Sequence, residues 1–111
     1  MKSIRQHRRA QLDILQALDY YRLEAGTKIA ESFVLSIEAS MDRLSRFPSM
    51  GSPHFGLMLN IPGLRTVLTP DFPYTVFYFE RDAHVDVVRV LHQRRDIPSL
   101  LSEDVETSPE S

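Results

Sequence analysis

The 111-residue sequence contains no cysteine and no tryptophan, and only two of its 13 basic residues are lysines. Without cysteine the chain forms no disulfide, offers no thiolate and lacks the ligands of cysteine-type zinc sites, as is usual in a reducing compartment. No apolar run reaches the roughly 18 residues that a membrane-spanning helix needs. The basic segment 1–10 leads into no long apolar stretch, so a secretory signal is not expected. These absences predict a cytoplasmic protein that does not enter a membrane.

The formal net charge is −2, but the acidic residues are unevenly placed. Residues 102–111 carry four acidic side chains and no basic one, which leaves 13 basic and 11 acidic side chains, a net +2, in the rest of the chain. Such a body lacks the concentrated positive field that nonspecific nucleic-acid binding requires. Length and charge predict a single domain over residues 1–101, followed by an acidic, disordered tail over 102–111.

Two amphipathic helices are predicted in the first half of the chain. From about Arg9 large apolar residues recur at steps of three and four, and Gly26 is placed to end this helix. Thr27 is placed to cap a second, longer helix with a clearer apolar stripe. Pro48 stops the second helix because proline has no amide hydrogen to donate. The short connection between the two predicts an antiparallel helical hairpin.

The second half reads as a loop followed by strands. Residues 48–63 contain three prolines and three glycines, which argues against a regular element there, although the segment is unusually apolar. The period then changes to two, and β-prone residues predict three strands, at Leu64–Thr69, Tyr74–Glu80 and Val85–His92. A hairpin loop is expected at 81–84. The segment Lys2–His7 is either an edge strand or a lead-in to the first helix.

The expected fold is α+β, with the helical hairpin packed on one face of a small antiparallel sheet and the element order β-α-α-β-β-β. One hairpin covers only one face of a sheet, so the other face is expected to expose apolar and aromatic side chains. The candidates for exposure are Tyr74, Val76 and Tyr78, or Phe77 and Phe79. Exposed apolar patches of this kind mark binding sites.

Common catalytic motifs are absent from the sequence: it has no HExxH, no glycine-rich phosphate loop and no GxSxG. Its four histidines lack metal-ligand spacing, so no metal or cofactor is predicted. The sharpest polar cluster is Arg94-Arg95-Asp96, after the last strand. It is either a charged strand exit or, together with Arg65 and Arg89, a corner that binds an anion or a protein partner.

Four stretches follow one another in a recognisable order: RFPSMGSP at Arg46–Pro53, GLR at Gly63–Arg65, FPYTVFY at Phe72–Tyr78 and VDVVRVLHQRRDIP at Val85–Pro98. With the helical hairpin, they resemble the ParE branch of the RelE/ParE toxin superfamily over residues 8–98. These are the toxins of type II toxin–antitoxin modules of the plasmid-stabilisation type. The resemblance implies a toxin that is neutralised by a small ParD-like antitoxin, whose C-terminal part is disordered until it wraps the toxin.

The superfamily divides into ribosome-dependent mRNA endonucleases of RelE type and ParE-type poisons of DNA gyrase. The nuclease branch typically has two basic residues two apart on the first strand after the loop, where this chain has Arg65 and Val67. It has an arginine on the next strand, near Thr75 here, and often a late tyrosine or histidine, whereas no tyrosine follows Tyr78. Arg94 matches the basic residue after the last strand. Because RNA cleavage needs proton transfer and stabilisation of phosphate charge, this depleted set favours the gyrase inhibitor.

The favoured interpretation is therefore a gyrase inhibitor with no catalytic residue or cofactor of its own and no sequence-specific contact to nucleic acid. One alternative is a RelE-type mRNA endonuclease that uses Arg65 and Arg94. Another is a non-toxic family member that only binds antitoxin. Contacts to the antitoxin or the target are expected from Arg65, Arg89, His92, Arg94 and Arg95.

Overall fold

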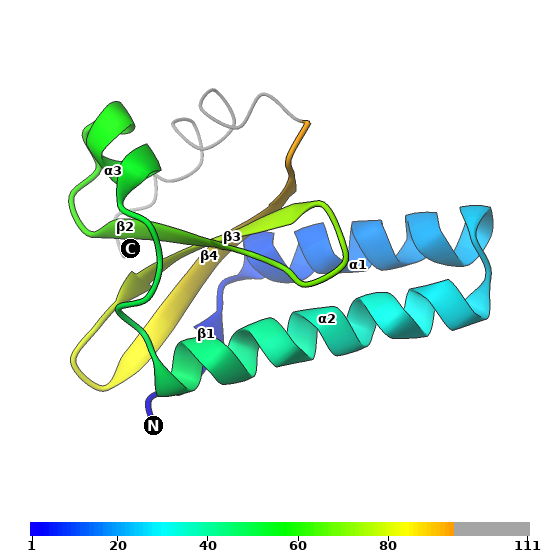
Figure 1. The fold of residues 1–111 in the computed structure, drawn as a ribbon, viewed down its shortest axis with the longest axis horizontal. Coiled ribbons are helices and arrows are strands. Elements are labelled where there is room, and N and C mark those ends of the chain that lie inside the picture. The colour runs from blue at the N-terminus through cyan, green and yellow to red at the C-terminus, as the bar shows by residue number, and fades with distance from the viewer. Residues whose placement is uncertain (95–111) are drawn as a thin grey trace.

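The structure, a computed structural model, describes residues 1–94 of the chain and has the predicted order of strands and long helices, with a short third helix before the second strand (Figure 1). The elements are β1 Ser3–Gln6, α1 Arg8–Glu24, α2 Thr27–Arg46, α3 His54–Leu59, β2 Leu64–Leu68, β3 Tyr74–Glu80 and β4 His84–His92. The four strands form one sheet in the order β1-β4-β3-β2, and α1 and α2 lie side by side as a hairpin. The α+β class and the β-α-α-β-β-β order are thus confirmed.

The sheet is mixed. The prediction of an antiparallel sheet is correct for its β2–β3 and β3–β4 pairs and wrong for β1. The first strand pairs in parallel with β4, from Ser3 opposite His84 to Gln6 opposite Val87. The N-terminal segment is therefore an edge strand rather than a helix lead-in, and β4 occupies the interior position that its long apolar run favours.

The helical hairpin ends where the sequence places its breaks, with one difference in detail. Gly26 follows α1 with a φ of 94°, a conformation that favours glycine, and its N–H donates to the Tyr21 carbonyl. Gly26 also occupies the N-cap position of α2, so Thr27 is the first helical residue and the prediction that it caps the helix is wrong. The second helix ends at Arg46, two residues before Pro48.

The expectation of no regular element in residues 48–63 is also wrong, because α3 lies within them. Its flanking prolines stand outside the helix, and Asn60 closes it in the left-handed conformation with a φ of 58°. Gly56 lets the α3 backbone approach β2: a Cβ there would lie 2.6 Å from the Leu64 carbonyl oxygen. A helix this short is stabilised by that packing rather than by its own propensity.

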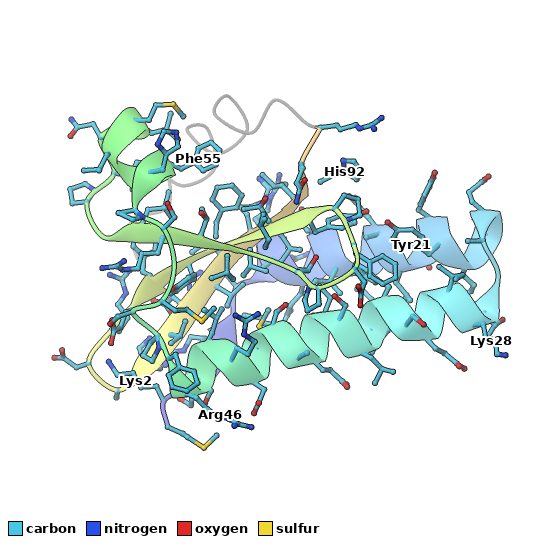
Figure 2. The ribbon with its side chains drawn as sticks, in the orientation of Figure 1. Lys2, Tyr21, Lys28, Arg46, Phe55 and His92 are labelled. Carbon is cyan, nitrogen blue, oxygen red and sulfur yellow. The ribbon has the colours of Figure 1, made fainter. Side chains whose placement is uncertain are left out.

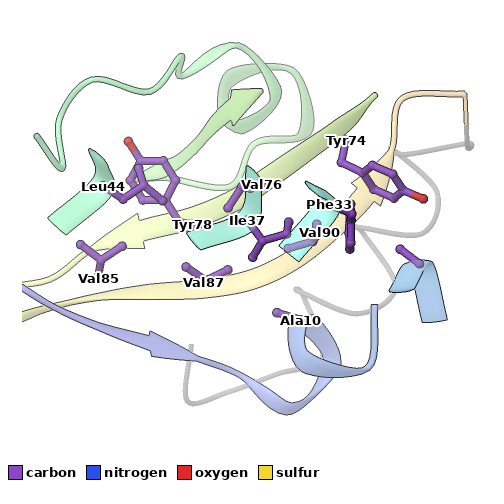
Figure 3. Close-up of a cluster of buried hydrophobic side chains, with 11 residues drawn as sticks. Ala10, Phe33, Ile37, Leu44, Tyr74, Val76, Tyr78, Val85, Val87 and Val90 are labelled. Atoms are coloured by element: carbon purple, nitrogen blue, oxygen red, sulfur yellow. The ribbon is translucent and has the colours of Figure 1, made fainter. Parts of the chain in front are cut away.

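Both faces of the sheet are covered. On the hairpin side Tyr74, Val76 and Tyr78 pack with residues such as Phe33 and Leu44 (Figure 3). On the opposite side Phe77 and Phe79 pack against residues of α3, of the segment that follows it, of β2 and of β4. These residues are Phe55, Leu59, Ile61, Leu64, Val88 and Leu91. All five predicted candidates are at most 8% exposed, so the prediction of an exposed β3 face is wrong. The unforeseen α3 layer is the reason.

Candidate functional site

The main candidate site is a cavity of about 640 Å³ between α1 and the end of β4, called here the α1–β4 cavity. Its lining residues are Asp13, Gln16, Ala17, Tyr20, Tyr21, Tyr74, Leu91, His92 and Arg94. Five of them come from α1, at spacings of three and four that place them on one side of the helix. The others come from the first residue of β3 and from the end of β4, which meet at the same end of the sheet.

Aromatic rings form the inner wall of this cavity. The Tyr74 and His92 rings are 5.2 Å apart in an edge-to-face arrangement, and Tyr21 stacks edge-on against Phe72 at the same distance. Figure 2 shows Tyr21 and His92 at the same end of the molecule. Tyr74 and Phe33 belong to the buried core, so this wall is held by the fold itself. Such a preformed wall suits an apolar or aromatic side chain of a ligand.

A buried ion pair forms the base of the cavity wall. The Arg89 guanidinium donates to both carboxylate oxygens of Asp13, through Nε at 2.8 Å and Nη2 at 2.9 Å. Asp13 also accepts the Val90 backbone N–H at 2.9 Å. The pairing of β1 with β4 stops at Gln6, so no strand lies beside Val90 on that edge of β4. The Asp13 carboxylate accepts the Val90 N–H in place of a strand carbonyl. The carboxylate therefore fixes α1 to β4 rather than facing a ligand.

This ion pair corrects the prediction for Arg89. The residue is only 3% exposed and its side chain is held inside the protein, so it is not a surface contact for a partner. Its partner Asp13 lies on α1. The two residues lie 76 positions apart, and no local pattern in the sequence links them.

His92 and Arg94, two of the five residues expected to contact a partner, both line the cavity and lie at its mouth. The Arg94 backbone N–H donates to His92 Nδ1 at 3.0 Å, so a neutral His92 carries its proton on Nε2. The Arg94 side chain is exposed. The mouth therefore presents a guanidinium and a ring N–H beside an aromatic wall. Arg95 and the segment 102–111 lie outside the described residues.

Arg65 lies on β2, outside the α1–β4 cavity. Its Nη1 donates to the Gly51 carbonyl at 2.7 Å, and Gly51 N–H donates to the Tyr78 hydroxyl oxygen at 2.9 Å. The Tyr78 hydroxyl in turn donates to the Pro48 carbonyl at 2.7 Å. Burial raises the pKa of Tyr78, and the Gly51 hydrogen bond and the Arg65 charge offset only part of that effect. Arg65 thus holds the loop after α2 against the sheet, away from His92 and Arg94.

A second polar cluster, which the sequence did not indicate, surrounds Asp86. Arg81 Nε donates to Asp86 Oδ2 at 2.9 Å, and the Nε2 atoms of His7 and His84 lie 3.2 and 3.0 Å from Oδ1. Burial acts to raise the pKa of Asp86, but the Arg81 and His7 hydrogen bonds and the nearby histidines outweigh it, so the pKa is lowered. The cluster joins the end of β1 to the β3–β4 turn. Across residues 1–94, no group of three or more histidine or acidic side chains could hold a metal ion.

Comparison with known proteins identifies the class. A family model for the ParE toxin of the type II toxin–antitoxin system parDE matches residues 4–97. The match spans most of the chain, and the protein belongs to the ParE toxin family. A solved chain from the chromosomal ParDE toxin–antitoxin system of P. aeruginosa is similar in fold, with a TM-score of 0.70 and 21% identity, covering 83% of this chain and 96% of that one. No curated protein sequence matches. Within residues 1–94, no helix is long and apolar enough to cross a membrane.

Proposed function

We propose that this protein is the toxin of a type II toxin–antitoxin module, that it inhibits DNA gyrase, and that a ParD-like antitoxin neutralises it. Membership of the ParE family supports the toxin role and the antitoxin partner. Gyrase is favoured over mRNA by the composition and the placement of the basic side chains. This proposal requires no catalytic residue and no cofactor.

The observation that carries the choice of target is the separation of Arg65 from Arg94. Arg65 is paired with Tyr78 across β2 and β3, whereas Arg94 follows His92, which is paired with Tyr74. Tyr74 and Tyr78 are four residues apart on β3, or roughly 13 Å along the strand. Stabilisation of a cleavage transition state requires both guanidinium groups to reach the same phosphate. Two groups anchored this far apart do not converge in that way. The Arg65 guanidinium is moreover engaged by the Gly51 carbonyl.

The test compares the two targets directly. Purified protein is expected to inhibit supercoiling by gyrase at concentrations that leave ribosome-bound mRNA intact. In cells, expression without the antitoxin is expected to produce filamentation and a DNA-damage response before translation stops. Codon-dependent mRNA cleavage by the pure protein would refute the proposal in favour of the endonuclease. Normal growth together with tight antitoxin binding would identify a non-toxic family member.

For antitoxin binding we propose contacts at the mouth of the α1–β4 cavity, where Arg94 and His92 suit an acidic side chain beside an apolar one. Arg94→Glu is expected to weaken antitoxin binding by about tenfold or more, as loss and reversal of a charge-assisted contact does. Arg43→Glu is the matched control, because Arg43 is an exposed arginine of α2 outside the cavity. Equal effects of the two substitutions on the antitoxin Kd, measured by calorimetry, would show that the cavity is not part of the antitoxin interface.

A further inference from the structure

The short helix α3 presents two large apolar side chains to solvent beside a hollow in the surface. Leu57 is 78% exposed and Met58 is 51% exposed, whereas Phe55 and Leu59 of the same helix pack inward against the sheet. The hollow has a volume of about 320 Å³, lies between α3 and the start of β2, and is called here the α3–β2 hollow. Its lining includes four apolar side chains and two polar ones: Pro53, Leu57, Ile61, Pro62, Asn60 and Arg65. Exposed apolar side chains grouped around a hollow mark a contact surface for another molecule.

The backbone around the α3–β2 hollow is fixed by the fold. Gly56 brings α3 so close to β2 that a Cβ there would lie 2.6 Å from the Leu64 carbonyl oxygen. Asn60 closes α3 in the left-handed conformation, and the Gly51 carbonyl accepts a hydrogen bond from Arg65 Nη1 at 2.7 Å. The hollow and its guanidinium are therefore in place before a partner arrives, which reduces the entropy lost on binding.

The charge of this surface has one sign. All 15 acidic residues of the chain lie outside the stretch from Phe47 to Pro70, in which Arg65 is the one lysine or arginine. Glu80 of β3 acts electrostatically on Arg65, but its carboxylate is paired with Lys2 Nζ at 2.9 Å. A carboxylate brought to the hollow would thus meet a guanidinium with little opposing charge. A single arginine among apolar side chains does not suit a nucleic-acid backbone, which is bound through several basic contacts.

The α3–β2 hollow and the α1–β4 cavity lie at opposite ends of β3. Leu64 in the hollow is paired with Phe79, whereas Tyr74 lines the cavity. Phe79 and Tyr74 are five residues apart, or roughly 17 Å along the strand. Figure 1 shows α3 and the helical hairpin on different sides of the sheet. The antitoxin contacts proposed at the cavity therefore leave the hollow available to a different partner.

We propose that Leu57, Met58 and the α3–β2 hollow form the surface that contacts gyrase. The occupant is a segment of gyrase that brings an apolar side chain to the hollow and a carboxylate to Arg65. An apolar anchor in a preformed pocket beside a charge-assisted contact is a common arrangement of the residues that dominate a protein interface. This inference rests on the proposed function, because it takes gyrase as the target. It assigns the target and the antitoxin to separate surfaces of the same protein.

The first test measures inhibition of gyrase supercoiling and binding of the antitoxin for the same variants of the full chain. Leu57→Glu is expected to raise the half-inhibitory concentration by about tenfold or more and to leave the antitoxin Kd within about twofold. Leu35→Glu is the control, because Leu35 is 64% exposed on α2 and lies outside the hollow; it is expected to change the half-inhibitory concentration by less than about twofold. Thermal unfolding checks that both variants are folded. Leu57→Ala removes the side chain without adding a charge and is expected to weaken inhibition severalfold.

The second test addresses the acidic character of the occupant. Asn60→Asp places a carboxylate in the lining of the hollow, and aspartate tolerates the left-handed conformation that Asn60 adopts. It is expected to raise the half-inhibitory concentration by about tenfold, because it repels the carboxylate of the partner. Asn60→Gly keeps the same backbone without a charge and is expected to stay within about threefold of the wild type. Equal effects of the two substitutions, or none from Asn60→Asp, would overturn the acidic occupant.

The outcomes separate this inference from the proposed function. A wild-type protein that inhibits gyrase, together with Leu57→Glu and Leu57→Ala variants that inhibit it equally well, overturns the α3 surface and leaves the proposed function intact. Loss of antitoxin binding by Leu57→Glu without loss of gyrase inhibition would assign the hollow to the antitoxin and would also overturn the inference. A folded wild-type protein that does not inhibit gyrase refutes the proposed function, and this inference with it.

Discussion

The buried ion pair between Asp13 and Arg89 gives the sharpest prediction for stability. Asp13→Ala removes two hydrogen bonds from the Arg89 guanidinium and the acceptor of the Val90 N–H. The Arg89 side chain is 4% exposed, so its charge is left without its carboxylate and with little access to water. Breaking a buried pair in this way costs about 3–5 kcal/mol. For a domain of this size that loss lowers Tm by more than about 10 °C.

Urea denaturation followed by circular dichroism measures this loss, and two further variants separate its causes. Asp19→Ala removes an exposed carboxylate from α1, whose ion pair is long, and is expected to change the free energy of unfolding by less than about 0.5 kcal/mol. Adding Arg89→Met to Asp13→Ala also removes the buried charge that has lost the Asp13 carboxylate, and it is expected to recover part of the stability. If Asp13→Ala costs less than about 1 kcal/mol, or if the double variant is no more stable than the single, the ion pair does not hold α1 to β4 as argued.

Three other predictions concern single sites. Gly56→Ala is expected to destabilise the protein by about 1–3 kcal/mol, because its Cβ would meet the Leu64 and Ile61 carbonyls, whereas Leu57→Ala on the exposed side of α3 is expected to be nearly neutral in the same denaturation assay. Tyr78→Phe leaves buried backbone groups unpaired and is expected to cost about 1–3 kcal/mol by thermal unfolding. Because the Asp86 pKa is lowered in the folded state, its stabilisation is present above about pH 4 and is lost as the pH falls through the folded-state pKa. Asp86→Asn should therefore flatten the decline in stability with acid, and an unchanged acid profile would contradict the role of this cluster.

The regular elements could be predicted because their signals are local. The run at Tyr74–Glu80 consists of β-branched and aromatic residues apart from its last position, and the strand has these bounds. The helix that contains Phe33 and Leu44 is set by a stripe of period 3.6 and by Pro48. By contrast, α3 has six residues between prolines, and its stability comes from the contact of Gly56 with β2. A contact of that kind between separate elements leaves no periodic pattern in the sequence.

The site was predictable only where its residues are neighbours along the chain. His92 is the last residue of β4 and Arg94 lies two residues beyond it, so both lie at one end of the sheet. Asp13 could not be assigned to Arg89, because that contact depends on where β1 ends and how α1 crosses β4. A bulge adds to the difficulty: the β3–β4 register shifts between Phe77 and Tyr78, so Val90 rather than Arg89 joins the core beneath the helices. Strict alternation of side chains between the two faces of β4 would instead place Arg89 in the core with Val85 and Val87.

The two faces of α1 link these observations. The inner face carries the core contacts and the Asp13 carboxylate, so substitutions there change the stability of the whole domain. The outer face carries exposed apolar side chains, and one of them, Tyr20, also lines the α1–β4 cavity. An antitoxin side chain bound in the α1–β4 cavity would therefore contact Tyr20 as well as His92 and Arg94.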